Sequence, residues 1–156
     1  MAPNSKDSGG ESFLKVLRPL VEAYFSFCAR DQPHIRSLGL TPSQFDVIAT
    51  LGDTRGMTCR QLSEATLVTK GTLTGVLDRL EAKGLVERLA SREDRRVTII
   101  QLTSEGQEKF RKVCANHINY LRPYFERALT AAEMGTLREL LLRLKESFDR
   151  GLNQPF

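Results

Sequence analysis

The apolar positions in the first third of the chain follow helical spacing. They recur at three- and four-residue intervals over residues 13–28, which predicts an amphipathic helix. Pro19 lies inside this stretch and predicts either a kink or a later start of the helix. A second helix is expected after Thr41, which can cap it, with Pro42 in the first helical position and Gln44 completing a capping box. Its buried face comprises Phe45, Ile48 and Leu51.

A third helix is predicted by a second capping box. Thr58 is the capping residue and Gln61 completes the box, while Leu62 and Ala65 are expected to face inward. A bend is expected at residues 66–68, so that the next helix follows after a tight turn.

The fourth apolar stretch is less regular at its start. Its buried positions have spacing i, i+3, i+4, i+7, and Gly84 ends it in the usual position after a helix. Residues 68–75, however, contain three threonines, two glycines and a valine, which are poor helix formers. The start of this helix therefore needs a reason beyond helix propensity. The predicted buried side chains are Leu73, Val76, Leu77 and Leu80.

The period then changes from helix to strand. Residues 85–90 and 96–102 alternate and are rich in β-branched side chains, which predicts a hairpin with a charged tip. Thr103 can cap a long helix, in which Pro123 is a candidate kink. A last helix is expected after residue 130.

Thr130 and Glu133 form a third capping box at the start of this last helix. Its broad apolar stripe consists of Leu137, Leu140, Leu141, Leu144 and Phe148. The predicted fold is mainly α, an α+β winged helix with element order α-α-α-α-β-β-α-α. We expect a flexible tail over residues 1–11, a dimerisation helix over 12–36, a winged helix-turn-helix over 37–103, and dimerisation helices over 104–152.

Two helices joined by a tight turn and followed by a charged hairpin are typical of DNA-binding proteins. The major groove admits one helix, and small side chains at its leading end let the backbone approach closely. Its free amides and the positive end of its dipole favour phosphate. We expect Arg60, Lys70 and the amides near Thr69 to bind phosphate, and Thr72, Thr74 and Arg79 to face bases. Gly71 belongs to the same leading end.

The hairpin tip is the second predicted DNA contact. Arg92, Arg95 and Arg96 lie within five residues, and guanidinium groups suit the narrow minor groove. Glu93 and Asp94 nearly cancel their charge, so the tip is not simply a basic patch. We expect Asp94 to shape the tip or to orient one arginine. The alternative is an ordinary solvated turn.

Composition is compatible with this interpretation but does not require it. The formal net charge of +4 and the pI near 9.1 permit nucleic-acid binding. Cys28, Cys59 and Cys114 are widely spaced and odd in number, as expected for free thiols in a reducing cytoplasm. We expect no secretory signal, and no transmembrane helix, because no run of 18 apolar residues occurs.

Three segments resemble the MarR (multiple-antibiotic-resistance regulator) family of winged helix-turn-helix transcriptional regulators. They are LTPSQFDVIATL, LSEATLVTKGTLTGVLDRLEAKGLVER and REDRRVTIIQLTSEG. The resemblance implies a homodimer, usually a repressor, that binds double-stranded DNA at a pseudo-palindromic operator. It implies that the helix over 69–83 enters the major groove and Arg96 the minor groove, and that many members respond to a small phenolic or anionic effector.

The resemblance also implies dimerisation through the first helix and the last two. The apolar stripes of these helices are too broad to be covered by a small winged module, which favours the same conclusion. The expected dimerisation residues are Phe13, Leu17, Leu20, Phe125, Leu137, Leu141, Leu144 and Phe148.

Other chemistry is poorly supported by the sequence. The peroxide-sensing branch of this family has its reactive cysteine early in the first helix, whereas Cys28 lies late in it. We therefore expect Cys28 to be a buried structural residue. His34 and His117 are too scattered for a metal site, and His117 is expected at an interface rather than against a ligand. Ser12–Lys15 matches one motif of penicillin-binding enzymes without its companions. We expect no enzyme and no cofactor; the competing hypothesis is a winged-helix protein-interaction module.

Overall fold

The computed structural model describes residues 10–151, with side chains from Ser12 onward. These residues form two compact units, which divide after Cys114. The tail expected over residues 1–11 lies mostly outside the described residues, and Gly10 and Glu11 already belong to the first helix. Within the described part, no helix is long and apolar enough to cross a membrane.

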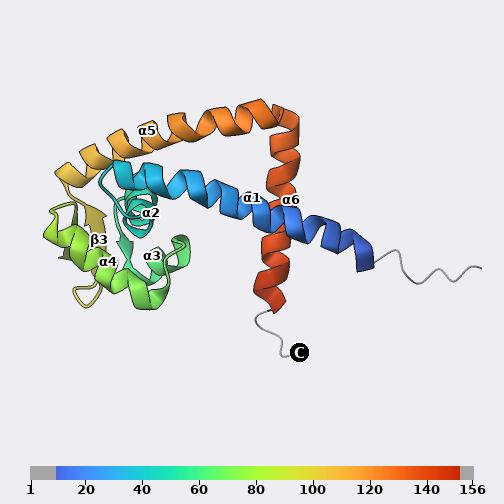
Figure 1. Cartoon of the computed structure of the whole chain (residues 1–156). Coiled ribbons are helices and arrows are strands. Elements are labelled where there is room, and N and C mark those ends of the chain that lie inside the picture. The colour runs from blue at the N-terminus through green and yellow to red at the C-terminus, as the bar shows by residue number, and fades with distance from the viewer. Residues whose placement is uncertain (1–9, 152–156) are drawn as a thin grey trace, which may run out of the picture. The chain divides into compact units, whose positions relative to one another are not determined.

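Four helices precede the hairpin in the first unit (Figure 1). They are α1 (Gly10–Ser37), α2 (Pro42–Leu51), α3 (Cys59–Ala65) and α4 (Lys70–Ala82). Helix α1 runs through Pro19, so a later start at that proline is wrong. The first turn of α1 lies well before Pro19, and a proline inside a helix removes one backbone hydrogen bond without ending it.

The sheet has three antiparallel strands in the order β1-β3-β2. β2 (Val86–Ala90) and β3 (Thr98–Leu102) form the predicted hairpin, with Val86 opposite Leu102. The sequence did not predict β1 (Met57–Thr58), which pairs with β3. A two-residue strand has too few positions to show an alternating pattern, and its second residue is also the cap of α3.

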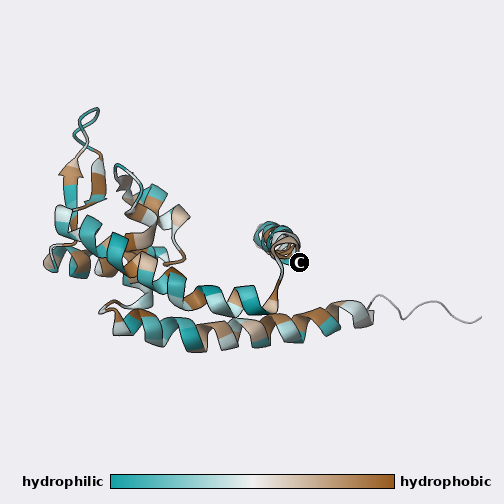
Figure 2. Ribbon diagram, turned by 90° about the horizontal axis from the view of Figure 1, so that it is seen from above, coloured by the Kyte–Doolittle hydropathy of each residue, from teal (hydrophilic) through white to brown (hydrophobic). Residues whose placement is uncertain are grey.

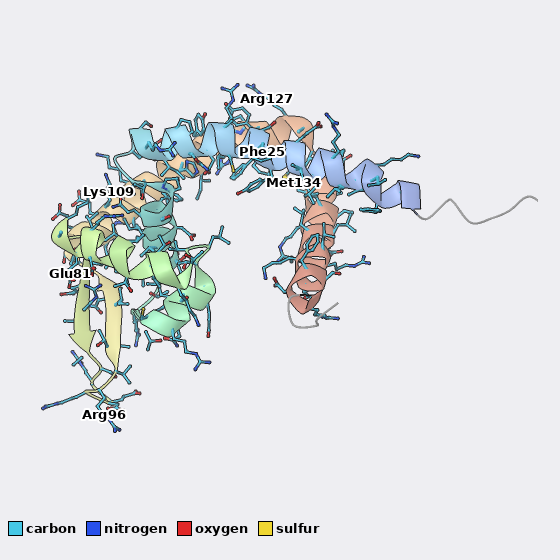
Figure 3. All side chains as sticks on the ribbon, turned by 60° about the horizontal axis from the view of Figure 1, so that its bottom comes forward. Phe25, Glu81, Arg96, Lys109, Arg127 and Met134 are labelled. Carbon is cyan, nitrogen blue, oxygen red and sulfur yellow. The ribbon has the colours of Figure 1, made fainter. Side chains whose placement is uncertain are left out.

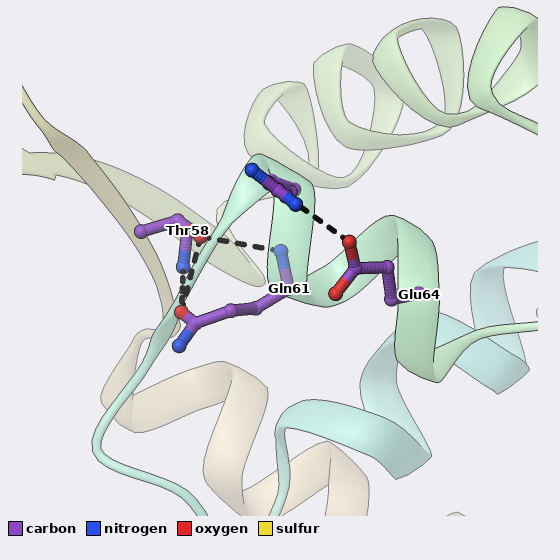
Figure 4. A network of polar contacts seen from close by, with 4 residues as sticks. Thr58, Gln61 and Glu64 are labelled. Carbon is purple, nitrogen blue, oxygen red and sulfur yellow. Dashed lines mark hydrogen bonds and ion pairs between the residues drawn. The ribbon is translucent and has the colours of Figure 1, made fainter.

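Both predicted capping boxes of this unit are confirmed. Thr41 Oγ1 accepts from the Gln44 amide at 3.2 Å, and Gln44 Oε1 accepts from the Thr41 amide at 3.1 Å. At α3, Thr58 and Gln61 repeat these contacts at 3.2 and 2.9 Å (Figure 4). These bonds satisfy amides that the helices leave unpaired at their starts.

The core of the first unit lies between α2, α3, α4 and the sheet. The predicted buried face of α4 is confirmed, and Leu62 is fully buried. Ala65 is exposed, so its predicted inward orientation is wrong; Thr66, four residues after Leu62, is buried instead. Phe45 packs against the core but is only partly buried. The largest buried side chains include Ile48, Leu51, Leu62, Leu73, Leu77, Leu80 and Ile100.

Thr103 connects the end of α4 to the start of α5 (Ser104–Ala128) by hydrogen bonds. Gly84 has φ +70°, a left-handed conformation that favours glycine and ends α4 as predicted. Thr103 Oγ1 donates to the Gly84 carbonyl at 2.5 Å and accepts from the Gly106 amide at 3.0 Å. Thr103 therefore caps α5, as the sequence predicts, and also fixes the turn that starts the hairpin.

The second unit comprises the end of α5 and helix α6 (Ala131–Gly151). Its predicted capping box is confirmed: the Thr130 amide donates to Glu133 Oε2 at 2.8 Å, and Thr130 Oγ1 accepts from the Glu133 amide at 3.3 Å. Pro123 lies within α5, which continues past it. No residue of α6 is buried among the described residues, although its stripe is apolar. Apolar residues also lie along the surface of α1 (Figure 2).

Candidate nucleic-acid interface

Helix α4 presents a side of very small residues to solvent. At about 100° per residue, the direction opposite its buried face contains Gly71, Gly75 and Ala82, with Asp78 beside them. A Cβ added at Gly71 or Gly75 would meet open space. No packing and no positive φ in the described chain therefore requires either glycine.

Other glycines of this unit have clear packing reasons. A Cβ at Gly52 would overlap the Phe110 ring, and one at Gly106 would overlap the Leu85 carbonyl. Neither reason applies to Gly71 and Gly75. A close approach of another molecule to the helix backbone is the requirement that glycine meets.

Hydroxyl and cationic side chains flank the glycine side of α4. Thr72 and Arg79 are seven residues apart and therefore lie within about 20° of one another around the helix. Lys70 and Thr74 lie together on the opposite flank, about 40° apart. All four are exposed. The helix thus presents donors on both sides of a smooth strip.

The first turn of α4 is not capped by a side chain. Thr69 is its N-cap residue, but the Thr69 hydroxyl contacts the Thr72 hydroxyl at 3.0 Å instead of a backbone amide. The leading amides of the helix, at Lys70 and Gly71, therefore stay available to an external acceptor. This is the arrangement in which a helix start binds phosphate.

The turn between α3 and α4 is fixed by a contact that sequence reasoning missed. Asp46 Oδ2 accepts from the Leu67 amide at 2.7 Å, which ties the turn to α2. The Leu67 side chain is 93% exposed. The exposure of Leu67 can be expected from the sequence, because Leu67 lies in a turn. The acceptor of the Leu67 amide cannot, because Asp46 is 21 positions away.

Arg60 extends from α3 into solvent. Its Nε lies 3.1 Å from Glu64 Oε1, one turn further along the helix (Figure 4). Both side chains are more than half exposed, so this ion pair contributes only a few tenths of a kcal/mol. Arg60 can exchange Glu64 for a phosphate at little cost.

The hairpin tip is organised by Asp94. Asp94 Oδ1 accepts from the Arg96 amide at 3.0 Å and from Arg96 Nε at 3.2 Å, and Oδ2 accepts from a terminal nitrogen of Arg96 at 3.3 Å. The backbone amide, followed by the guanidinium, lowers the pKa of the Asp94 carboxyl. Arg96 stands at the far end of the hairpin (Figure 3). Arg92 and Arg95 are exposed beside it.

Arg88 links the hairpin to α4, a role the sequence analysis did not assign. From β2 its guanidinium donates to Asp78 Oδ1 at 2.6 Å and also to Glu81. Asp78 and Glu81 raise the pKa of Arg88, with the hydrogen bond to Asp78 the largest cause. The contacts neutralise two carboxylates on the exposed part of α4. The sequence shows that these three residues carry opposite charges, but only the folded structure shows that they are in contact.

The ten residues expected to contact DNA are all exposed and all belong to the first unit. They lie on α3, at the start and flanks of α4, and at the hairpin tip. Among the described residues, no cluster of three or more His, Cys, Asp or Glu side chains is placed to hold a metal ion.

The three cysteines and His117 have different environments. Cys59 is exposed, whereas Cys28 and Cys114 are half-buried, so Cys28 is less buried than expected. Burial, followed by the charge of Asp53, raises the pKa of the Cys114 thiol. His117 is buried and lies 6.4 Å from the Tyr120 ring.

The known proteins that this chain resembles are transcriptional regulators. A family profile described as "MarR family" matches residues 38–97. The HTH-type transcriptional regulator MhqR of Bacillus subtilis strain 168 is 38% identical over 96 residues, which are 62% of this chain and 66%, just under two thirds, of that protein. The HTH-type transcriptional repressor MdtR of the same strain is 32% identical over 109 residues, 70% of each chain.

Solved structures extend the similarity to nearly the whole chain. AbsC, a MarR family transcriptional regulator from Streptomyces coelicolor, has a TM-score of 0.79 and 25% identity, covering 96% of this chain and 99% of AbsC. NadR in complex with 4-hydroxyphenylacetate has a TM-score of 0.69 and 25% identity, covering 92% and 97%. The proteins in these comparisons are transcriptional regulators and not enzymes.

Proposed function

Because the chain belongs to the MarR family and is a DNA-binding transcriptional regulator, we propose that it is a homodimeric cytoplasmic repressor, released from a pseudo-palindromic operator by a small effector. The observation that carries this proposal is the open space over Gly71 and Gly75, on a helix whose flanks carry hydroxyls and cations. The name of MdtR as a repressor supports the direction of regulation.

The assignment of contacts follows from exposure and helix geometry. Arg60, Lys70 and the amides that follow Thr69 bind phosphate. Thr72, Thr74 and Arg79 face base edges, where a hydroxyl can pair with either type of edge. Arg96 enters the minor groove, held in place by Asp94 and supported by Arg92 and Arg95.

Dimerisation is supported by the terminal helices. Within residues 12–27 of α1 no side chain is buried, and the same holds for all of α6. A helix whose apolar stripe is not covered is marginal in water. A second copy can cover these stripes, and a two-fold axis places two α4 helices for half-sites about 34–36 Å apart. Seven of the eight expected dimerisation residues are exposed; Leu20 is half-buried.

An aromatic hollow supports the proposed effector. It lies on α5 in the second unit and is lined by Tyr120, Tyr124, Pro123 and Arg127. The Tyr120 and Tyr124 rings meet edge to face at 5.8 Å. Aromatic faces beside a guanidinium suit a phenolic or aromatic carboxylate ligand. The complex of NadR with 4-hydroxyphenylacetate makes this ligand class the first to test.

Selection of bound DNA from a random duplex pool tests the repressor proposal. We expect an inverted repeat whose half-sites are one helical turn apart, about 10–10.5 base pairs. The competing hypothesis, a winged-helix protein-interaction module, predicts that no sequence is enriched. Loss of the Arg96 guanidinium in Arg96→Ala should weaken binding to the selected site by about 1–3 kcal/mol.

A further inference from the structure

A hollow with three cations lies on the flank of α4, and we call it the α2 hollow. Arg36 from the end of α1, Thr41 and Gln44 from the start of α2, and Arg79, Ala82 and Lys83 from the end of α4 line it. All of these residues belong to the first unit. None of the lining residues carries a carboxylate.

The cations of the α2 hollow have no acidic partner among the described residues. Arg36 donates to Gln32, an uncharged side chain, at 3.3 Å. Lys83 Nζ lies 3.5 Å from Gln44 Oε1. By contrast, Arg60, Arg88 and Arg96 each contact a carboxylate. Three positive charges that face one hollow without compensation raise its potential for an anion.

The walls of the hollow are well fixed. Gln44 is 4% exposed and is held by the capping box with Thr41. The start of α2, a ten-residue helix, contributes the positive end of its dipole. The hollow therefore combines an oriented amide side chain, a helix start and three cations.

The position of the hollow relates it to DNA. Arg79 lies on the same flank of α4 as Thr72, about 10 Å further along the helix axis. Lys83 follows one turn later on that flank. If Thr72 faces the floor of the major groove, the strand that borders the groove passes the Arg79 and Lys83 end of the helix.

We propose that Arg36 and Lys83 of the α2 hollow bind a backbone phosphate of the operator, beside the base edges that Arg79 faces. The proposal rests on the proposed function and adds Arg36 and Lys83 to the DNA-binding residues. The ligand chemistry is that of an oxyanion, which a free phosphate or carboxylate could also supply. The experiment therefore separates these sources.

The test is the salt dependence of binding to duplex DNA by the full chain. Arg36→Gln, Lys83→Gln and the double variant remove cations of the hollow, and Lys112→Gln removes an exposed cation of α5 outside it. Each protomer loses one phosphate contact, so the slope of log K against log salt becomes less steep by about 2 per dimer. Affinity falls about a hundredfold near 0.1 M salt, equally on operator and on mixed-sequence DNA.

The matched controls fix the interpretation. Lys112→Gln retains the wild-type slope, and Lys83→Arg retains most of it because the charge is kept. The affected side chains are exposed, and thermal unfolding is expected at the wild-type temperature in each variant. A double variant with the wild-type slope, alongside a weakened Arg96→Gln, overturns the phosphate site and leaves the proposed function intact.

A free anion is tested on the protein without DNA. Inorganic phosphate is added in millimolar steps while the amide signals of Thr41 and Gln44 are followed by NMR. Saturable shifts together with an unchanged DNA slope in the double variant would assign the hollow to a free anion and overturn the proposal. A flat slope for the wild-type protein would instead contradict the proposed function itself.

Discussion

Gly71 and Gly75 lower the stability of the helix that contains them. Glycine in a helix interior is less favourable than alanine by about 0.8–1 kcal/mol. Neither position has a positive φ, and neither has a neighbour within 4 Å of an added Cβ. The glycines therefore act against the stability of α4, and we propose that they permit a close contact with another molecule.

Alanine at Gly75 should separate stability from DNA binding. Gly75→Ala is expected to raise the free energy of unfolding by about 0.5–1 kcal/mol and to weaken operator binding, because its methyl group would meet the duplex. Denaturant unfolding and fluorescence anisotropy measure the two effects. Gly135→Ala in α6, where an added Cβ also meets nothing, is the matched control and should change stability alone. Undiminished operator affinity in Gly75→Ala would refute a close backbone approach.

We expect Arg88 to affect DNA binding through its contacts with α4. In Arg88→Gln, Asp78 and Glu81 lose their cationic partner and repel the phosphates beside the groove. We expect weaker binding at low salt, with the difference shrinking at high salt as the two charges are screened. Arg88→Lys should recover part of the loss, since it keeps the charge but not the two-pronged contact. Equal affinity of Arg88→Gln and wild type at low salt would remove this role.

At the scale of elements, the capping boxes were the most predictable features. Thr41, Thr58 and Thr130 each lie three residues before a side chain that returns the hydrogen bond, so the signal is local. The two-residue strand β1 gave no such signal, because its hydrogen bonds depend on β3 about forty positions later. The exposure of Ala65 also escaped prediction, since a helix of seven residues has too few apolar positions to show which side packs.

The stability of the hairpin tip around Asp94 should depend on pH. The hydrogen bonds from the Arg96 amide and guanidinium lower the pKa of Asp94. The stabilisation of the tip is therefore complete above the ordinary pKa of an aspartate and is lost as the pH falls through the lower value in the folded protein. NMR titration of the Asp94 carboxyl carbon should give a midpoint below about 3.9.

The variant Arg96→Ala provides the control for this titration. It should raise the midpoint only in part, because the backbone amide at position 96 still donates to the carboxylate. A titration midpoint of Asp94 at the ordinary value for an aspartate in the wild-type protein would show that its contacts with Arg96 do not form in solution.

At the scale of the whole molecule, the uncovered apolar stripes call for a second copy. Leu141 is 44% exposed in the stripe of α6. Leu141→Glu should therefore shift sedimentation equilibrium from twice the 17.6 kDa chain mass toward the monomer. Leu89→Glu on β2, at a leucine of 42% exposure, is the matched control and should stay dimeric. A wild-type protein that is monomeric at micromolar concentration would contradict the proposed dimer.

The sequence predicted the helices and the hairpin because their signals are periodic or local. It could not predict how distant charges pair. The contacts of Arg88 with Asp78 and Glu81, and of Asp46 with Leu67, join positions seven to 21 residues apart across different elements. The α2 hollow likewise gathers Arg36, Gln44 and Lys83 from three helices.

The central claim is that α4 and the hairpin of β2 and β3 bind duplex DNA by contacts with its phosphates and its grooves. The most direct test is equilibrium binding of the wild-type protein to its selected operator over a range of salt concentrations. Phosphate contacts from two protomers predict that log K falls linearly with log salt, with a slope of about −4 or steeper. A flat slope, or equal affinity for the operator and for mixed DNA at every salt concentration, would contradict the account.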